Sequence, residues 1–209
     1  MLSTKREKQI LKDPIIYVLG CDEVGRGSLA GPVVAGVAAF DENFFRHRPT
    51  WSTLVNDSKQ LSARIRTELA FHIKQSAVAW SVGVVHASVI DKINILQATK
   101  RAAELAAQKI HMQLGVGSEK TFLLIDGNFL LPHYLGTQES VIRGDGSVFC
   151  IAAASILAKV YRDELMTRLD EKFSGYGFAQ HKGYGTKFHF AQIKRLGLSP
   201  VHRRTFYNR

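Results

Sequence analysis

The stretch Gly20-Cys21-Asp22-Glu23-Val24-Gly25-Arg26-Gly27 carries the strongest structural signal in this sequence. It overlaps the end of the apolar run 15–21, whose β-branched residues are typical of a buried strand. Two adjacent acids therefore stand where a strand ends, and the glycines after them let the backbone turn toward a ligand. Like charges about 4 Å apart repel by roughly 4 kcal/mol at an effective dielectric constant of about 20, and a divalent cation is the usual reason for such a pair. A solvated acidic turn is the alternative for the pair taken alone.

The other apolar runs predict strands and helices of an α/β domain. Strands are expected over residues 15–21, 33–40, 77–85, 121–125 and 140–142, the first two forming an antiparallel hairpin. Helices are expected after the cap Ser62 with Ile65, Leu69 and Ile73 inward, from the cap Asn94 to about 112 with Leu96, Ala103, Ala107 and Ile110 inward, and over 147–173 and 187–196. A hairpin followed by strands that alternate with helices indicates a mixed β-sheet flanked by helices on both faces.

The 209 residues are enough for one well-buried core. Residues 1–13 are polar and basic, and we expect them to form a flexible arm. Residues 14–209 are expected to form a single domain, which includes a small helical and basic C-terminal extension from about residue 174.

The net charge of +10, from 28 Lys and Arg against 18 acids, suggests a polyanionic partner, nucleic acid first. No apolar run reaches the 18 or more residues that would span a bilayer, so no membrane association is expected. Two cysteines fit unpaired thiols in a reducing cytoplasm better than a disulfide framework. Nothing in the sequence requires an obligate protein partner, and we expect a monomer.

Two further strands end in an acid followed by glycine, at Asp126 and Asp145. Each acid taken alone is also compatible with a turn former or a helix cap. Ligands gather at strand ends in sheets of this kind, so both acids should lie near the Asp22-Glu23 pair. Hard oxygen donors without paired His or Cys favour Mg²⁺ or Mn²⁺ over Zn²⁺. Rival acids on the long helix are more consistent with solvent exposure or with pairing to Arg162, Arg168 or Lys172; they are Asp163, Glu164 and Asp170.

Taken in order, several motifs resemble those of the bacterial ribonuclease HII family over nearly the whole chain. They are Asp22-Glu23-Val24-Gly25-Arg26-Gly27, Asn56-Asp57-Ser58-Lys59, Ile125-Asp126-Gly127-Asn128, Gly144-Asp145, Ala153-Ala154-Ser155-Ile156-Leu157-Ala158-Lys159-Val160, Tyr176-Gly177-Phe178 with His181-Lys182-Gly183-Tyr184, and His202-Arg203-Arg204. Each motif is weak alone, but their order and spacing together are specific.

The resemblance implies a ribonuclease H-like fold and a metal-dependent endoribonuclease. Such an enzyme hydrolyses the RNA strand of RNA/DNA hybrids and incises 5′ of single ribonucleotides in duplex DNA, leaving a 5′-phosphate and a 3′-hydroxyl. Asp22, Glu23, Asp126 and Asp145 match the family's four acidic metal ligands. The implied chemistry uses two Mg²⁺ or Mn²⁺ ions that clamp the scissile phosphate.

The resemblance also implies a substrate-binding set. Gly25, Arg26 and Gly27 match the motif that senses the ribose 2′-hydroxyl, and Tyr184 matches the tyrosine that packs at the RNA-to-DNA junction. This fits a backbone that approaches a sugar closely, because the 2′-hydroxyl distinguishes RNA from DNA. Four basic residues are expected to contact phosphates, namely Lys59, Lys182, Arg203 and Arg204. Three positions depart from the family pattern: Ser28, Arg143 and Cys150.

Two other functions compete with this interpretation. The segment Gly25-Arg26-Gly27-Ser28-Leu29-Ala30 fits a dinucleotide fingerprint, as in an NAD-dependent oxidoreductase. That fingerprint must open a helix, whereas the residues after Pro32 predict a strand. A non-catalytic module that binds RNA/DNA hybrids fits the basic charge equally well, but a pure phosphate binder gains nothing from four acids near its ligand.

Overall fold

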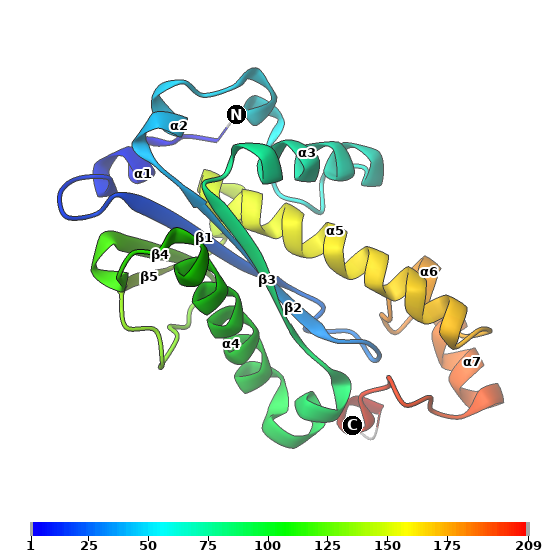
Figure 1. The fold of residues 1–209 in the computed structure, drawn as a ribbon. Coiled ribbons are helices and arrows are strands. Elements are labelled where there is room, and N and C mark those ends of the chain that lie inside the picture. Colours follow the sequence, from blue (N-terminus) through cyan, green and yellow to red (C-terminus); the bar gives the residue numbers. More distant parts are fainter. Residues whose placement is uncertain (1, 208–209) are drawn as a thin grey trace.

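A five-stranded sheet organises residues 2–207, the part of the chain that this computed structural model describes (Figure 1). Its strands are β1 (Tyr17–Val24), β2 (Val33–Phe40), β3 (Ala79–Val85), β4 (Thr121–Asp126) and β5 (Thr137–Val141), in the spatial order β3-β2-β1-β4-β5. β2 is antiparallel to β1 and β3, whereas β4 is parallel to β1 and β5. The predicted hairpin and the mixed sheet are both confirmed.

Helices cover both faces of the sheet. α4 (Ala87–Leu114) lies on one face, and α3 (Ala63–Ser76) and α5 (Phe149–Lys172) lie on the other (Figure 1). The remaining helices of the described chain are α1 (Lys5–Ile10), α2 (Glu42–Arg46), α6 (Phe178–His181), α7 (Lys187–Leu196) and α8 (Arg204–Tyr207), with 3-10 turns at Thr50–Leu54, Ser118–Lys120 and Gly144–Gly146. Helices α6, α7 and α8 follow α5 in the C-terminal part of the chain. Within residues 2–207 no helix has the length and apolar character needed to cross a membrane.

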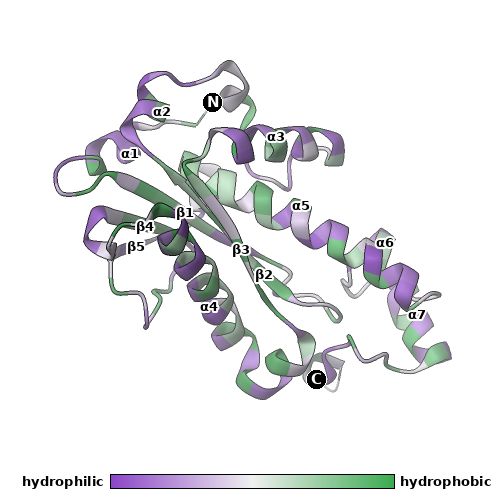
Figure 2. Ribbon diagram, in the orientation of Figure 1, coloured by the Kyte–Doolittle hydropathy of each residue, from purple (hydrophilic) through white to green (hydrophobic). Residues whose placement is uncertain are grey.

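The backbone of α5 lies directly on the sheet. A Cβ built on Gly20 would be 2.0 Å from the carbonyl carbon of Cys150, and one on Gly36 would be 2.4 Å from the carbonyl oxygen of Ala154. Only glycine permits this approach. The first half of α5 is apolar and buried, while its second half is more polar (Figure 2). The helix therefore lies against the same face of β1 that carries Asp22.

Two predicted helix caps are confirmed. The Ser62 hydroxyl accepts a hydrogen bond from the Ile65 amide at the start of α3. The Asn94 side chain accepts hydrogen bonds from the amides of Leu96 and Gln97, and its positive φ of 64° kinks α4, which begins at Ala87, about two turns earlier than predicted. Ile65 and Leu96, both predicted to face inward, are instead 40% exposed.

The N-terminal segment differs from the expected flexible arm. Residue 1 is outside the described range, but residues 5–10 form α1, and Leu2 packs into the core. The Glu7 side chain is fully buried and accepts a hydrogen bond from the amide of Cys150 at the start of α5. Arg6 forms an ion pair with Glu139 on β5. These long-range contacts order a segment whose composition alone suggested disorder.

Candidate metal and nucleic-acid site

Three carboxylates meet at one edge of the sheet. β1 and β4 are parallel neighbours with Cys21 opposite Ile125, so Asp22 and Asp126 leave the sheet side by side. Asp145 lies on the turn that follows β5. One oxygen from each of these three acids lies within 4.8 Å of the others. The predicted convergence of strand ends is confirmed for Asp22, Asp126 and Asp145.

A hydrogen bond links two of these acids through the backbone. The Asp126 Oδ1 atom accepts from the amide of Gly144 at 2.6 Å, next to Asp145 in sequence. Arg143, immediately before, takes a left-handed conformation with a φ of 54°, which closes the turn after β5. Asp22 is positioned separately, because its Oδ1 accepts from the amide of Glu23 at 2.7 Å.

Glu23 is outside this group of three. Successive side chains of a strand alternate in direction, so Glu23 leaves β1 in a different direction from Asp22, although both residues border one cleft. Its Oε1 atom lies 3.4 Å from the guanidinium of Arg26. The sequence predicted four acids in one cluster, and the structure brings three together with the fourth beside them.

The electrostatics of this group favour a bound cation. Burial raises the pKa of the Asp22 carboxyl well above its ordinary value, and the negative charge of Glu23 raises it further. Burial, followed by the charge of Asp145, also raises the pKa of Asp126. Both raised pKa values mean that the ionised form of these carboxyls is destabilised unless a positive charge lies nearby. A bound divalent cation would supply that charge.

Lys59 supplies part of that positive charge. Its Nζ atom lies 3.3 Å from Oδ2 of Asp145, although the Lys59 side chain is 77% exposed. Partial burial lowers its pKa, but the charges of Asp145 and Asp22 outweigh that effect and raise it overall. One exposed ammonium does not balance three acids, and the donor set consists only of hard oxygens. The group therefore fits Mg²⁺ or Mn²⁺.

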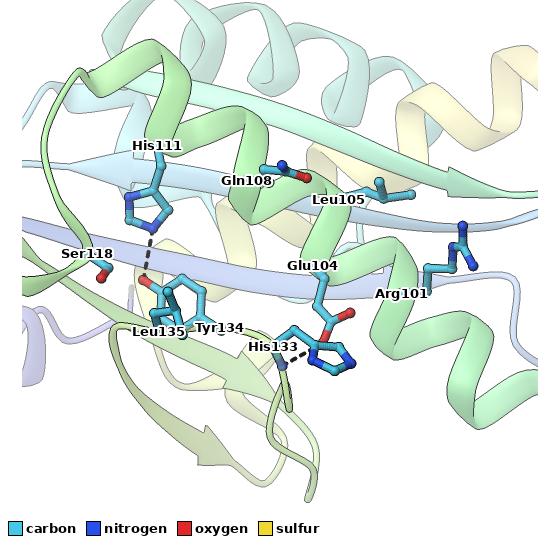
Figure 3. Close-up of a pocket in the computed structure, with 9 residues that line it drawn as sticks. All are labelled: Arg101, Glu104, Leu105, Gln108, His111, Ser118, His133, Tyr134 and Leu135. Atoms are coloured by element: carbon cyan, nitrogen blue, oxygen red, sulfur yellow. Dashed lines mark hydrogen bonds between the residues drawn. The ribbon is translucent and has the colours of Figure 1, made fainter.

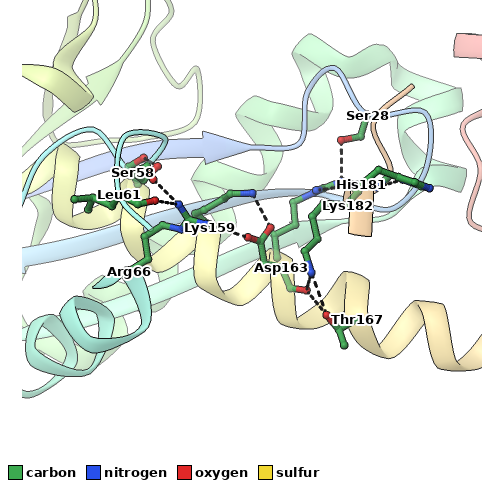
Figure 4. A network of polar contacts seen from close by, with 12 residues as sticks. Ser28, Ser58, Leu61, Arg66, Lys159, Asp163, Thr167, His181 and Lys182 are labelled. Carbon is green, nitrogen blue, oxygen red and sulfur yellow. Dashed lines mark hydrogen bonds and ion pairs between the residues drawn. The ribbon is translucent and has the colours of Figure 1, made fainter. Parts of the chain in front are cut away.

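A cleft of about 410 Å³ opens beside these acids. It is lined by Asp22, Glu23, Val24, Ser58, Lys59, Arg66, Ser155, Lys159 and Tyr184. Two of its basic residues, Arg66 and Lys159, had not been assigned a role from the sequence. Both reach Asp163, at 3.9 and 2.7 Å respectively (Figure 4). The available signal was the i, i+4 spacing of Ser155, Lys159 and Asp163, which places them on one face of α5.

The rival acids of α5 are engaged elsewhere. Asp163 pairs with Lys159 and Arg66 rather than with the arginines predicted from helical spacing. Asp170 accepts a hydrogen bond from the amide of Phe178 at the start of α6. Neither belongs to the acidic group at the strand ends.

The predicted phosphate contacts have different surroundings. Lys59 borders the cleft, and the Lys182 ammonium donates to the Asp163 carbonyl and to the Thr167 hydroxyl (Figure 4). Arg204 is exposed, and its amide donates to Asp91. Arg203 is fully buried, with its guanidinium bonded to backbone carbonyls. The prediction that Arg203 contacts phosphate is therefore wrong.

Tyr184 and Gly27 are placed where a ligand could reach them. Tyr184 lines the cleft and is 39% exposed. Gly27 is exposed, and no atom outside its chain neighbours lies within 4 Å of an ideal Cβ built on it. The backbone at this position is therefore open to close approach.

A larger cavity, of about 510 Å³, lies elsewhere, between α4 and residues 133–135 (Figure 3). His111 Nε2 is 3.3 Å from the Tyr134 hydroxyl, and the amide of His133 donates to Glu104. This cavity contains none of the residues that the sequence singled out. Asp22 and Glu23 line the smaller cleft and not this cavity.

Comparison with known proteins agrees with this geometry. The family model described as ribonuclease HII matches residues 19–209. The chain belongs to the ribonuclease HII family. The ribonuclease HII of Chlorobaculum tepidum is 46% identical over 207 residues, covering 99% of this chain and 96% of that protein. That of Oleidesulfovibrio alaskensis is 44% identical and covers 91% of this chain and 78% of that protein.

Solved structures of other ribonucleases share the fold. Ribonuclease H2 from Pyrococcus horikoshii has a TM-score of 0.66 and 28% identity, covering 91% of this chain and 93% of that one. A Bst ribonuclease HIII in complex with Mn²⁺ has a TM-score of 0.72 at 20% identity, covering 92% and 68%, and supports the fold alone. As a member of the ribonuclease HII family, the chain is a ribonuclease H type 2 hydrolase. The dinucleotide alternative fails, because the Gly25-Arg26-Gly27 segment leads into strand β2 instead of opening a helix.

Proposed function

We propose that this protein is a metal-dependent endoribonuclease that cuts the RNA strand of RNA/DNA hybrids. It also incises 5′ of a single ribonucleotide embedded in duplex DNA, leaving a 5′-phosphate and a 3′-hydroxyl. The observation that carries the proposal is the group formed by Asp22, Asp126 and Asp145, whose oxygens lie within 4.8 Å of one another beside a basic cleft. Membership of the ribonuclease HII family supports the same chemistry.

Asp22, Asp126 and Asp145 are the proposed ligands of Mg²⁺ or Mn²⁺. Glu23 completes the set from the adjacent position when its carboxylate leaves Arg26, from which it is 3.4 Å away. Two divalent ions held by these residues would lower the pKa of an attacking water and would stabilise charge on the leaving 3′ oxygen. A Bst ribonuclease HIII of the same fold was solved in complex with Mn²⁺.

The cleft's basic side chains bind and orient the substrate backbone. Lys59, Arg66 and Lys159 line the same cleft as Asp22 and Glu23. Asp163 fixes the Lys159 ammonium at 2.7 Å, so this charge is held in place before a phosphate arrives. A fixed cation stabilises charge developing on a phosphate without reorganising during the reaction.

Recognition of the ribose is assigned to the loop after β1. The open backbone at Gly27 lets a sugar approach, and the 2′-hydroxyl is the group that marks RNA. Tyr184, whose exposed ring borders the same cleft, packs against the nucleotide at the RNA-to-DNA junction. The proposed partners are therefore RNA/DNA hybrids and DNA duplexes that contain a ribonucleotide.

The test is an incision assay on a duplex with one ribonucleotide, in Mg²⁺, in Mn²⁺ and in EDTA. We expect a metal-dependent cut 5′ of the ribonucleotide, abolished in Asp126→Asn and in Asp145→Asn, with duplex binding retained. Glu42→Gln is the matched control, because Glu42 is an exposed carboxylate paired with Arg46 away from the cleft. Full activity of either aspartate variant would remove the metal assignment. Binding of hybrids by the wild type without metal-dependent cutting would favour a non-catalytic module instead.

A further inference from the structure

Two arginines are fully buried next to the Gly25-Arg26-Gly27 loop: Arg162 on α5 and Arg203 in the C-terminal segment. Buried arginines are usually paired with a carboxylate. Throughout residues 2–207, neither of these guanidiniums has an acid within 4.0 Å. Within that range, all of their hydrogen-bond partners are backbone carbonyls, except for one serine hydroxyl.

Arg203 holds the loop itself. Its two terminal nitrogens donate to the carbonyls of Gly25 at 2.7 Å and Arg26 at 2.8 Å. Its Nε donates to the carbonyl of Gly31 at 3.0 Å. One planar guanidinium thus fixes three carbonyls of the same connection between β1 and β2, an arrangement that an ammonium cannot reproduce.

Arg162 joins that loop to the segment that carries Tyr184. It donates to the Ser28 hydroxyl at 2.9 Å and to the carbonyl of Pro32 at 3.0 Å, both on the loop side. On the other side it donates to the carbonyl of Lys182 at 2.9 Å, and its guanidinium carbon lies 5.8 Å from the centre of the Tyr184 ring. The dashed line at Ser28 in Figure 4 marks the loop side of this contact.

The two arginines are packed tightly against the residues they hold. A Cβ on Gly25, whose φ is 90°, would lie 2.1 Å from Nε of Arg162. The loops also bond directly, because the amide of Leu29 donates to the carbonyl of Gly183 at 2.8 Å. Arg162, which contacts both segments, therefore fixes the position of the loop relative to Tyr184.

Burying two positive charges costs desolvation free energy that neutral hydrogen-bond donors would not. Burial, and then the like charge of Arg162, lowers the pKa of Arg203 to about 9. Neutral donors could bond the same carbonyls without that penalty. Two charged guanidiniums with no acid within 4.0 Å among residues 2–207 instead suit a site whose negative charge arrives with the ligand.

We infer that Arg162 and Arg203 are positioning residues that hold the ribose-reading loop and Tyr184 at the spacing of an RNA-to-DNA junction. The inference rests on the proposed function, because it gives those two elements their roles. A single ribonucleotide in DNA must satisfy the loop and Tyr184 together. A continuous RNA/DNA hybrid offers many ribose sites and needs no junction.

The experiment compares Arg162→Lys and Arg203→Lys on two substrates: a DNA duplex with one ribonucleotide, and a continuous RNA/DNA hybrid. Losing hydrogen bonds from a charged donor should raise KM for the single ribonucleotide roughly tenfold or more. We expect KM for the hybrid to change less than about threefold and kcat at saturation to be retained, because the strand-end acids are untouched.

Arg48→Lys is the matched control. Arg48 also donates to backbone carbonyls, those of Leu2 and Ser52, but at a distance from the cleft, so both KM values should stay at wild-type levels. If the lysine variants do not fold, Ser28→Ala removes a single acceptor of Arg162, and the KM ratio of the two substrates should shift in the same direction by a smaller factor.

The outcomes separate the two proposals. A wild type that does not incise either substrate would overturn the proposed function. A wild type that incises, with variants whose KM ratio is unchanged or whose losses are equal on both substrates, would overturn the positioning role alone.

Discussion

Replacing Gly27 by alanine separates recognition of a ribose from stability of the fold. No atom outside its chain neighbours lies within 4 Å of an ideal Cβ at Gly27, so the methyl group enters open space in the free protein. The substitution should stabilise the fold by about 0.4–1 kcal/mol, because alanine restricts the unfolded chain. In the complex the same methyl group occupies the space through which the sugar approaches.

The expected loss of activity is large. Carbon atoms pack at about 3.5–4.0 Å, so an added methyl group moves a sugar that touches the backbone by roughly 1 Å or more. A displacement of about 1 Å at a reacting centre can cost on the order of 100-fold in rate. We therefore expect kcat/KM for a single-ribonucleotide duplex to fall about 100-fold, while affinity for an all-DNA duplex changes little.

The measurement pairs incision kinetics with chemical denaturation, and Gly25→Ala serves as the contrast. At Gly25 a Cβ would lie 2.1 Å from Arg162 Nε at a φ of 90°, so that variant should be destabilised as well as inactive. Wild-type incision kinetics in Gly27→Ala would refute the reasoning whatever the stability of the variant, since no ligand would then approach this backbone closely.

Two further predictions concern charge. Asp22→Asn should raise the free energy of unfolding in EDTA by about 1 kcal/mol or more, because it removes a buried, repelled carboxylate. Mg²⁺ should raise the melting temperature of the wild type more than that of this variant, and equal shifts in both would contradict the site. The pKa of His202 is lowered by burial, and then by His189, from 6.5 to about 4, so unfolding takes up a proton in this range. Stability should fall as pH drops from about 6.5 toward 4, by about 2 kcal/mol between pH 8 and pH 5. His202→Asn keeps an acceptor for Ser199 and should flatten this dependence in denaturation curves; parallel curves would exclude His202 as the cause.

The convergence of Asp22, Asp126 and Asp145 could be predicted from sequence because it depends on local signals. Apolar runs mark the strands, and an acid after each run marks its end. Parallel pairing of β1 with β4 then brings those ends together. The caps at Ser62 and Asn94 were predictable for the same reason, since a cap is decided within one turn of helix.

The burial and the hydrogen-bond partners of the longer side chains could not be predicted in this way. Arg203 resembles a surface base in sequence, and its burial depends on carbonyls at Gly25, Arg26 and Gly31, about 170 positions away along the chain. The order of α1 likewise depends on Glu7 reaching Cys150 across the fold. The position of Glu23 could not be predicted for a different reason: neighbouring residues of a strand point in different directions, so adjacency to Asp22 in sequence did not place Glu23 within the group of three acids.

The contact between α5 and the sheet at Gly20 and Gly36 has a consequence for how the enzyme moves. With no side chains between the two backbones, the helix cannot slide or tilt without separating from the strands. Asp22 on β1 and Lys159 on α5 therefore belong to one rigid body. Amide hydrogens along this contact should be among the slowest in the protein to exchange with solvent. If the proposed function holds, the substrate must fit a cleft in which Asp22 and Lys159 keep a constant separation, so adaptation to different duplexes falls to the nucleic acid and to the loops around the cleft.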